Sequence, residues 1–260
     1  MDTVLLSADS ADITIAAELI KNGEIVGIPT ETVYGLGADA SNEEAVRGIF
    51  AAKGRPADNP LIVHLADFSD AVKYTTDIPE LAYRLAERFC PGPLTIVLPK
   101  NEKIPMVTSG GLDTVGIRVP SHPVMHRIIA ESGRPIAAPS ANTSGYPSPT
   151  SAQHVMRDMN GKVAAVVDGG ESKFGVESTV IAIEDKNTVR ILNRGQSMRY
   201  DKACTSLHQT RKCVLNLQLG SGVDRGGRFV EDHNRRIGNG GTGNRDQLAL
   251  TLRKVRTVRA

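Results

Sequence analysis

Two cations stand close together in a proline-rich stretch of the sequence, Lys53-Gly54-Arg55-Pro56-Ala57-Asp58-Asn59-Pro60. Arginine presents a planar fork that suits phosphate, and lysine presents a compact positive charge. One residue separates them, so an extended backbone would point both side chains to the same side. This spacing predicts a phosphate-binding loop, with a solvated cationic turn as the alternative.

A third cation, Arg118, lies within the apolar run Thr114–Val119. An unpaired charge in a buried strand is costly, so Arg118 needs an anionic partner. Either a carboxylate of the protein or the carboxylate of a ligand could supply it, and the residues alone leave both possibilities open.

Small hydroxyl and amide side chains gather just after apolar segments, at Pro29–Gly37, Ala138–Thr150 and Gly175–Val180. Such groups bind phosphates, ribose or base edges, and ligand sites of α/β proteins collect at strand ends. Each stretch alone also fits an ordinary turn, and Ser178 could simply begin a strand. Together with the cations, they favour nucleotidyl transfer by positioning and charge neutralisation over covalent catalysis. The phosphate-loop signature GxxxxGK[ST] does not occur in the sequence, and GxGxxG occurs only at Gly238–Gly243, within the glycine-rich stretch near the C-terminus and not after a predicted strand.

Alternating helices and strands must position these stretches. Apolar spacing predicts helices over residues 11–21, 41–52, 79–89, 123–131 and 151–158, the second opened by a capping box of Ser41 and Glu44. Strands are predicted over residues 25–28, 61–65, 94–98, 114–119, 136–138, 163–167, 178–183 and 189–192. This alternation predicts an α/β domain. The third and fourth strands, and the last two, are close enough in sequence to pair antiparallel, so we expect a mixed sheet.

The formal net charge of +2 over 260 residues conceals a division of the chain. Residues 199–260 carry 13 basic and 5 acidic side chains, a charge of +8, whereas residues 1–198 carry 18 and 24, a charge of −6. All 14 prolines precede residue 199, and Gly220–Asn244 holds eight glycines and almost no apolar residue. The division predicts a catalytic domain over 1–198 and a basic Gly/Arg-rich C-terminal extension over 199–260. Three interpretations of the extension stay open: a poorly ordered tail, an arm that binds a polyanion, or a segment translated from a reading frame other than the ancestral one.

The composition also argues against several classes of protein. No apolar run approaches the roughly 20 residues of a membrane span, and the N-terminus lacks the pattern of a signal peptide. The three cysteines form no CxxC motif, which argues against a disulfide framework or a cysteine-based zinc site, and no metal ligands are assigned. We therefore expect a cytoplasmic protein without a membrane partner.

Four motifs in order carry a resemblance to a known family. They are Pro29–Gly37, Lys53-Gly54-Arg55-Pro56 with Asn59-Pro60-Leu61, Pro91-Gly92-Pro93-Leu94-Thr95, and Pro139-Ser140-Ala141-Asn142. The chain resembles the YrdC-like threonylcarbamoyl-AMP synthases over residues 10–192. The resemblance implies an α/β fold, a YrdC-like twisted mixed sheet with flanking helices and a cationic concave cavity. It also implies that L-threonine, bicarbonate and ATP, the last with Mg²⁺, yield threonylcarbamoyl-AMP and pyrophosphate. The product would pass to a tRNA threonylcarbamoyl-transferase complex.

The same resemblance implies roles for individual residues. The positions that match the L-threonine site are Thr32, His64, Arg118, Ala138 and Ser178. The positions that match the ATP site are Lys53, Arg55, Asn59, Thr114, Ser140, Asn142 and Ser148. Lys53 and Arg55 are also the catalytic candidates, because they would lower the repulsion between the two reacting anions. No general base is assigned.

The chain departs from the family pattern after the last predicted strand. The family usually has Leu-Arg-Pro-Gly there, whereas this chain has Leu192-Asn193-Arg194-Gly195. Asn193 takes the place of the arginine that reaches the nucleotide. A backbone shift of one residue would let Arg194 replace it, so Arg194 is also a candidate nucleotide ligand.

Two other functions compete with this interpretation. An RNA-binding module would make weak RNA contact through the cavity and the basic extension, but only 4% of residues are aromatic and no stacking pattern is present. A carbamoyl-transfer domain of the kind found in hydrogenase maturation proteins shares the fold. The zinc-finger and acylphosphatase-like segments expected of those proteins do not occur in the sequence.

Overall fold

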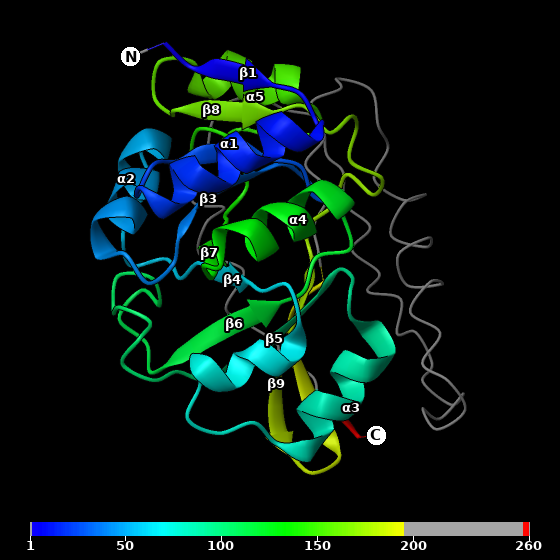
Figure 1. Cartoon of the computed structure of the whole chain (residues 1–260). Coiled ribbons are helices and arrows are strands. Elements are labelled where there is room, and N and C mark those ends of the chain that lie inside the picture. Colours follow the sequence, from blue (N-terminus) through cyan, green and yellow to red (C-terminus); the bar gives the residue numbers. More distant parts are fainter. Residues whose placement is uncertain (1, 195–256, 260) are drawn as a thin grey trace, which may run out of the picture.

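The computed structural model describes residues 2–194 and 257–259 as a mixed sheet flanked by helices (Figure 1). The strands are β1 (Val4–Leu6), β2 (Val26–Ile28), β3 (Gly35–Asp39), β4 (Ile62–His64), β5 (Leu94–Pro99), β6 (Thr114–Arg118), β7 (Ile136–Ala137), β8 (Ala165–Val167), β9 (Thr179–Asp185), β10 (Thr188–Arg194) and β11 (Thr257–Arg259). The helices are α1 (Ser10–Lys21), α2 (Glu43–Lys53), α3 (Glu80–Phe89), α4 (Pro123–Ser132), α5 (Ala152–Met159) and the 3₁₀ helix η1 (Phe68–Lys73).

The strand order is β1-β8-β2-β3-β7-β4-β6-β5-β9-β10-β11. The predicted α/β class and mixed sheet are confirmed. The two predicted antiparallel pairs also form, between β5 and β6 and between β9 and β10, while β4 pairs with β6 and β5 with β9 in parallel.

Four elements were not predicted, namely β1, β3, η1 and β11. The most instructive is β3, whose Gly-Leu-Gly-Ala-Asp sequence looked like part of a ligand-binding loop. It is a fully buried strand, antiparallel to β2. A Cβ atom at Gly37 would collide with the Ile28 side chain, so glycine is needed here for packing inside the sheet.

The start of α2 also differs from the prediction. Its N-cap is Asn42, whose Oδ1 accepts hydrogen bonds from the backbone N–H groups of Glu44 and Ala45 at 3.0 and 3.2 Å. The Ser41 hydroxyl instead donates to the Asp39 carboxylate at 2.5 Å. The predicted capping box is therefore wrong by one residue, because Asn accepts the same N-terminal hydrogen bonds as Ser.

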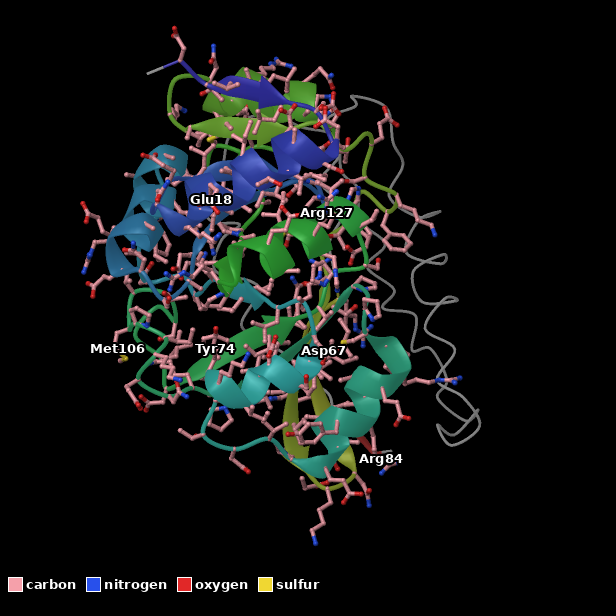
Figure 2. The ribbon with its side chains drawn as sticks, viewed as in Figure 1. Glu18, Asp67, Tyr74, Arg84, Met106 and Arg127 are labelled. Carbon is pink, nitrogen blue, oxygen red and sulfur yellow. The ribbon has the colours of Figure 1, made fainter. Side chains whose placement is uncertain are left out.

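Helices cover both faces of the sheet around β8 and β2. On one face α1 and α4 lie side by side (Figure 1), joined by a 2.8 Å hydrogen bond from the Thr14 hydroxyl to Glu131. Figure 2 shows Glu18 of α1 and Arg127 of α4 on these neighbouring helices. On the other face α5 packs closely, since a Cβ atom at Gly27 would lie 3.0 Å from a methyl group of Val155.

Among residues 2–194 and 257–259, η1 and α3 pack against the same face of the sheet around β4, β6 and β5. Alternate residues such as Val63, Ile96 and Ile117 belong to the large apolar core, which also includes residues of η1 and α3. The intervening residues, His64 and Arg118 among them, point to the opposite face. This second face carries the candidate site described below.

The predicted boundary near residue 198 lies outside the described residues, as does nearly all of the basic extension. Within the extension, Thr257–Arg259 form β11, which pairs antiparallel with β10. Among residues 2–194 and 257–259, no helix has the length and apolar character that a membrane span needs.

Candidate functional site

A cavity of about 120 Å³ opens on the face of β4 and β6 that carries His64 and Arg118, and residues at the start of β9 also line it. The structure brings all five predicted threonine-site residues to its lining: Thr32, His64, Arg118, Ala138 and Ser178. Two of the predicted nucleotide residues, Arg55 and Ser140, line it as well. Residues that are more than 140 positions apart in sequence therefore share one cavity.

Sheet register explains why these side chains meet. His64 of β4 lies directly beside Arg118 of β6, and Arg118 lies directly beside Thr95 of β5. Gly116 occupies the same face two residues before Arg118, and a Cβ atom there would lie 2.9 Å from the Thr95 methyl group. Thr114 shares this face four residues from Arg118, a separation of roughly 13 Å along a strand.

The buried Arg118 has a carboxylate partner within the protein. Its Nη2 atom donates to Glu31 Oε1 at 2.5 Å and to the Thr32 hydroxyl at 2.9 Å. The side chains of Arg118 and Glu31 are each 5% exposed. The sequence left open whether protein or ligand supplies this anion, and the structure shows that the protein does. Glu31 was not among the predicted site residues; the only signal for it was a charged residue inside the Pro-Thr-Glu-Thr motif.

The buried imidazole of His64 is uncharged. Burial, with a smaller contribution from the positive charge of Arg118, lowers the pKa of His64 to about 3. Its Nδ1 lies 3.3 Å from the carbonyl oxygen of Ile136, and a carbonyl can only accept, so Nδ1 carries the proton. His64 therefore offers the cavity a neutral polar ring.

Two hydroxyl pairs complete this end of the cavity. Thr32 Oγ1 lies 2.8 Å from Thr30 Oγ1, and Ser178 Oγ lies 2.8 Å from Thr95 Oγ1. All four side chains are buried. Each lining hydroxyl is thus held by a second hydroxyl behind it, which orients the group before any ligand arrives.

The backbone from Lys53 to Arg55 is not extended, contrary to the conformation on which the prediction relied. Lys53 is the last residue of α2, and Gly54 reverses the chain at φ +61°. The Lys53 ammonium is buried and donates to the carbonyl oxygens of Ser140 and Asn142, the latter at 2.7 Å. Burial, followed by the nearby charge of Arg55, lowers the pKa of Lys53 to about 7. Lys53 therefore supports the loop after β7 and is not among the residues lining the cavity.

Arg55 lines the cavity but is held loosely. Its Nη2 makes one long hydrogen bond of 3.4 Å to the Pro60 carbonyl, and its Nε is buried with no hydrogen-bond partner in the described chain. Burial lowers the pKa of Arg55, while Glu177 and Asp58 act in the opposite direction. Of these two acids, Glu177 also lines the cavity.

The Sua5/YciO/YrdC family model, described as "Telomere recombination", matches residues 18–195. The chain belongs to this family. It is 58% identical over 173 residues to the threonylcarbamoyl-AMP synthase of Pyrococcus abyssi, covering 66% of this chain and 51% of the relative. It is 53% identical over 181 residues to the enzyme of the same name from Bacillus subtilis, covering 69% and 52%.

Solved structures agree with the family assignment. P. abyssi Sua5 complexed with L-threonine matches with a TM-score of 0.72 and 53% identity, covering 74% of this chain and 58% of that one. HypF in its phosphate- and nucleotide-bound form matches with a TM-score of 0.62 but 24% identity, which shows a common fold only. The chain spans about half the length of the curated relatives it matches first.

The remaining predicted nucleotide residues do not line the cavity. Asn59, Thr114, Asn142, Ser148 and Arg194 are not in its lining. Ser148 is nearest by contact, because its hydroxyl donates to Glu177 at 3.3 Å. Asn142 donates through Nδ2 to the Tyr146 carbonyl at 2.7 Å. Their contact with a nucleotide stays a prediction.

The family departure at the end of β10 has a clear structural outcome. Asn193 lines the cavity, and the exposed Arg194 does not. The pairing of β10 with β9 is irregular between Ile191 and Asn193, which shifts the alternation of side chains along β10 by one residue. The register pairs Asn193 with Val180, another lining residue. Asn193, and not Arg194, therefore lies in the cavity lining.

The expected cationic character of the cavity is not confirmed. Arg118 is paired with Glu31, and Glu177 lines the cavity together with Arg55. His64 is neutral, as its lowered pKa shows. Each cation of the lining therefore has an acidic residue near it.

Proposed function

We propose that the chain is an L-threonylcarbamoyladenylate synthase, a nucleotidyltransferase that converts L-threonine, bicarbonate and ATP to threonylcarbamoyl-AMP and pyrophosphate. The observation that carries the proposal is the convergence of the five threonine-site positions on one cavity around Arg118. The relatives named threonylcarbamoyl-AMP synthase, and P. abyssi Sua5 with L-threonine, support it.

The amino acid binds at the Arg118 end of the cavity. Arg118 pairs with the α-carboxylate, and the hydroxyls of Thr32 and Ser178 supply shorter-range hydrogen bonds to polar groups of the ligand. His64 is uncharged, so it lines the cavity as a polar ring without attracting a second anion. The backbone N–H of Ala138 donates to the Ile62 carbonyl at 3.1 Å, which holds this part of the lining next to β4.

The nucleotide binds toward Arg55 and the loop from Ser140 to Ser148. Threonine carbamate and the α-phosphate are both anions, so their approach requires neutralisation. Arg55 supplies this charge from the cavity lining. Lys53 acts one step back, by holding the carbonyl groups of Ser140 and Asn142. Alignment of the two substrates then contributes most of the rate, and no general base is required.

The residues present fit Mg²⁺ bound with ATP. Mg²⁺ binds proteins through one or two carboxylates and otherwise through water and substrate phosphates. Among residues 2–194 and 257–259, no group of three or more acidic, histidine or cysteine side chains forms a dedicated metal cage. Glu177 is the carboxylate of the cavity lining and would hold the ion, which would neutralise phosphate charge.

The wider roles follow from the reaction. Threonylcarbamoyl-AMP is an activated carbamoyl donor, so it serves tRNA threonylcarbamoyladenosine modification through a separate transferase complex. Weak RNA contact through the basic extension and a cytoplasmic location stay predictions.

Pyrophosphate release is the direct test. The full chain, given ATP and Mg²⁺, should release pyrophosphate only when both L-threonine and bicarbonate are present. ATP cleavage that is indifferent to L-threonine would overturn the proposal. If the activity is confirmed, L-serine in place of L-threonine measures the selectivity of the amino-acid end.

A further inference from the structure

We propose that Glu31 is a positioning residue that decides which edge of the Arg118 guanidinium faces the amino acid. Glu31 and Thr32 occupy Nη2, so Arg118 offers an α-carboxylate its Nη1 edge. This inference rests on the proposed function, because it assigns the α-carboxylate of L-threonine to Arg118.

The hydrogen-bond inventory of Arg118 carries the argument. A guanidinium has five N–H groups: one on Nε and two on each Nη. Nη2 donates to Glu31 Oε1 at 2.5 Å and to the Thr32 hydroxyl at 2.9 Å, which uses both of its N–H groups. Nε points toward the Gly92 carbonyl at 3.4 Å. Within the described chain, Nη1 alone has no hydrogen bond, and Arg118 lines the cavity.

This arrangement limits how a ligand carboxylate can bind. An unrestrained guanidinium would grip a carboxylate with two parallel N–H groups, one from each Nη atom. Here Nη2 is already committed, so Nη1 binds the carboxylate and the second carboxylate oxygen turns toward other donors of the lining. Glu31 thereby converts a general anion site into one with a defined ligand orientation.

Glu31 is itself immobile, which a positioning residue requires. Its second carboxylate oxygen, Oε2, accepts a hydrogen bond from the Ser121 backbone N–H at 3.1 Å. Its backbone carbonyl accepts from the Phe174 N–H at 2.9 Å. The carboxylate of Glu31 is thus tied to the segment from Arg118 to Ser121 and its main chain to the loop at Phe174, and the side chain is 5% exposed.

Glu31→Gln is the informative variant, because it keeps the shape and removes the charge. Glutamine cannot balance the Arg118 charge, so Nη2 loses its strongest partner and the guanidinium is free to turn. The measurement is calorimetric titration of the full chain with L-threonine and with L-threonine amide, in the presence of a non-hydrolysable ATP analogue and Mg²⁺. The ratio of the two affinities reports the carboxylate contact alone.

Asp39→Asn is the matched control. Asp39 is also a buried carboxylate near an arginine, with Oδ2 3.6 Å from Arg134 Nε, but it does not line the cavity. We expect Glu31→Gln to lower the preference for L-threonine over its amide at least tenfold, with affinity for the ATP analogue changed less than threefold. Asp39→Asn should leave the preference as in the wild type. General loosening of the fold would weaken both amino-acid ligands equally and leave the ratio unchanged.

The outcomes separate the two proposals. A wild-type chain that prefers L-threonine, with the same preference in Glu31→Gln, overturns this inference and leaves the proposed function standing. A wild-type chain that binds neither ligand overturns both. If Glu31→Gln does not fold, Glu31→Asp keeps the charge but shortens its reach by one methylene, and it must still lower the ratio.

Discussion

The two arginines of the cavity are held in opposite ways. Arg118 sits in a closed network, with Glu31 2.5 Å away and both side chains 5% exposed. Arg55 has one long hydrogen bond to the Pro60 carbonyl and an Nε atom without a hydrogen-bond partner in the described chain. We call the part of the cavity around Arg118 the amino-acid end and the part around Arg55 the nucleotide end.

The difference indicates at which step, folding or ligand binding, the side chains of each end lose their conformational freedom. The amino-acid end is ordered during folding, so a small ligand finds its donors in place and loses little affinity to rearrangement. The nucleotide end keeps an arginine whose hydrogen-bonding capacity is largely unused, so it is ordered by the ligand. A larger, highly charged ligand can supply that ordering, because it makes more contacts.

The largest expected effect on stability and binding is that of Arg118→Ala, which removes the arginine at the centre of the amino-acid end. Removing one partner of a buried ion pair leaves the other charge uncompensated, which costs about 3–5 kcal/mol of stability. Urea unfolding should show this loss, and L-threonine binding should disappear from calorimetry. The control is Arg127→Ala on the surface of α4, which breaks a pair with Glu131 and should cost at most about 1 kcal/mol. Equal losses in the two variants would contradict the idea of a closed, ordered end.

Arg55→Ala tests the nucleotide end, and its effect should fall on binding and not on stability. Losing a charge-assisted hydrogen bond to phosphate costs about 1.5–3 kcal/mol, or roughly 10- to 100-fold in affinity for an ATP analogue. The free energy of unfolding should change by no more than about 0.5 kcal/mol, because Arg55 has few partners to lose. Arg47→Ala, in an exposed pair with Glu43, is the control. A large loss of stability in Arg55→Ala would mean that this end is as closed as the other.

Lys53→Met tests the loop after β7, whose carbonyl groups accept hydrogen bonds from Lys53. It leaves the carbonyl groups of Ser140 and Asn142 without their donor, at a cost of about 1–3 kcal/mol. The pH dependence has a defined sign. The pKa of Lys53 is lowered to about 7, so between pH 7 and the ordinary value of 10.5 the unfolded chain binds a proton that the folded chain does not.

Wild-type stability should therefore rise relative to Lys53→Met between about pH 7 and 10. A neutral amine still has two N–H groups, enough for both carbonyls. Urea unfolding of the two proteins at pH 7 and pH 9 measures the change, and a gap that narrows as the pH rises would contradict it.

The smallest expected effect is that of pH on L-threonine binding through His64. Because the pKa of His64 is lowered to about 3, the ring stays neutral and affinity should be flat between pH 5 and 8. Stability behaves differently. In the unfolded chain His64 is protonated below about pH 6.5, whereas in the folded protein it stays neutral down to about pH 3, so unfolding takes up a proton in this range. The stability advantage of the wild type over His64→Gln should therefore shrink on going from pH 7 to pH 4. An inflection in threonine affinity near pH 6.5 would show that the ring titrates normally.

Local sequence rules predicted most of the fold. Apolar periodicity located the five α-helices, and short spacing between strands predicted the antiparallel pairs β5–β6 and β9–β10. The same rules missed β3, because glycines usually mark loops and here relieve a collision with Ile28. Whether a glycine is needed for a turn or for packing depends on its neighbours across the sheet.

The candidate site divides in a similar way. The resemblance to the family indicated the five residues of the predicted threonine site, position by position, and the structure brings all five to one cavity. The motifs did not indicate that Lys53 binds backbone carbonyl groups of the loop after β7, because they did not show that the helix continues to Lys53 and that Gly54 then reverses the chain. They also did not indicate whether Asn193 or Arg194 faces inward, which is a matter of register.

The sequence by itself thus determined which groups could bind a carboxylate and a phosphate, and on which elements they lie. Only the tertiary structure decided how each charge is partnered. Glu31 and Arg118 are 87 residues apart, and their contact exists because the segment after β2 and the end of β6 are brought together by the intervening strands. Periodicity and capping act over a few neighbouring residues, whereas charge pairing depends on register between distant segments, and burial then sets its strength.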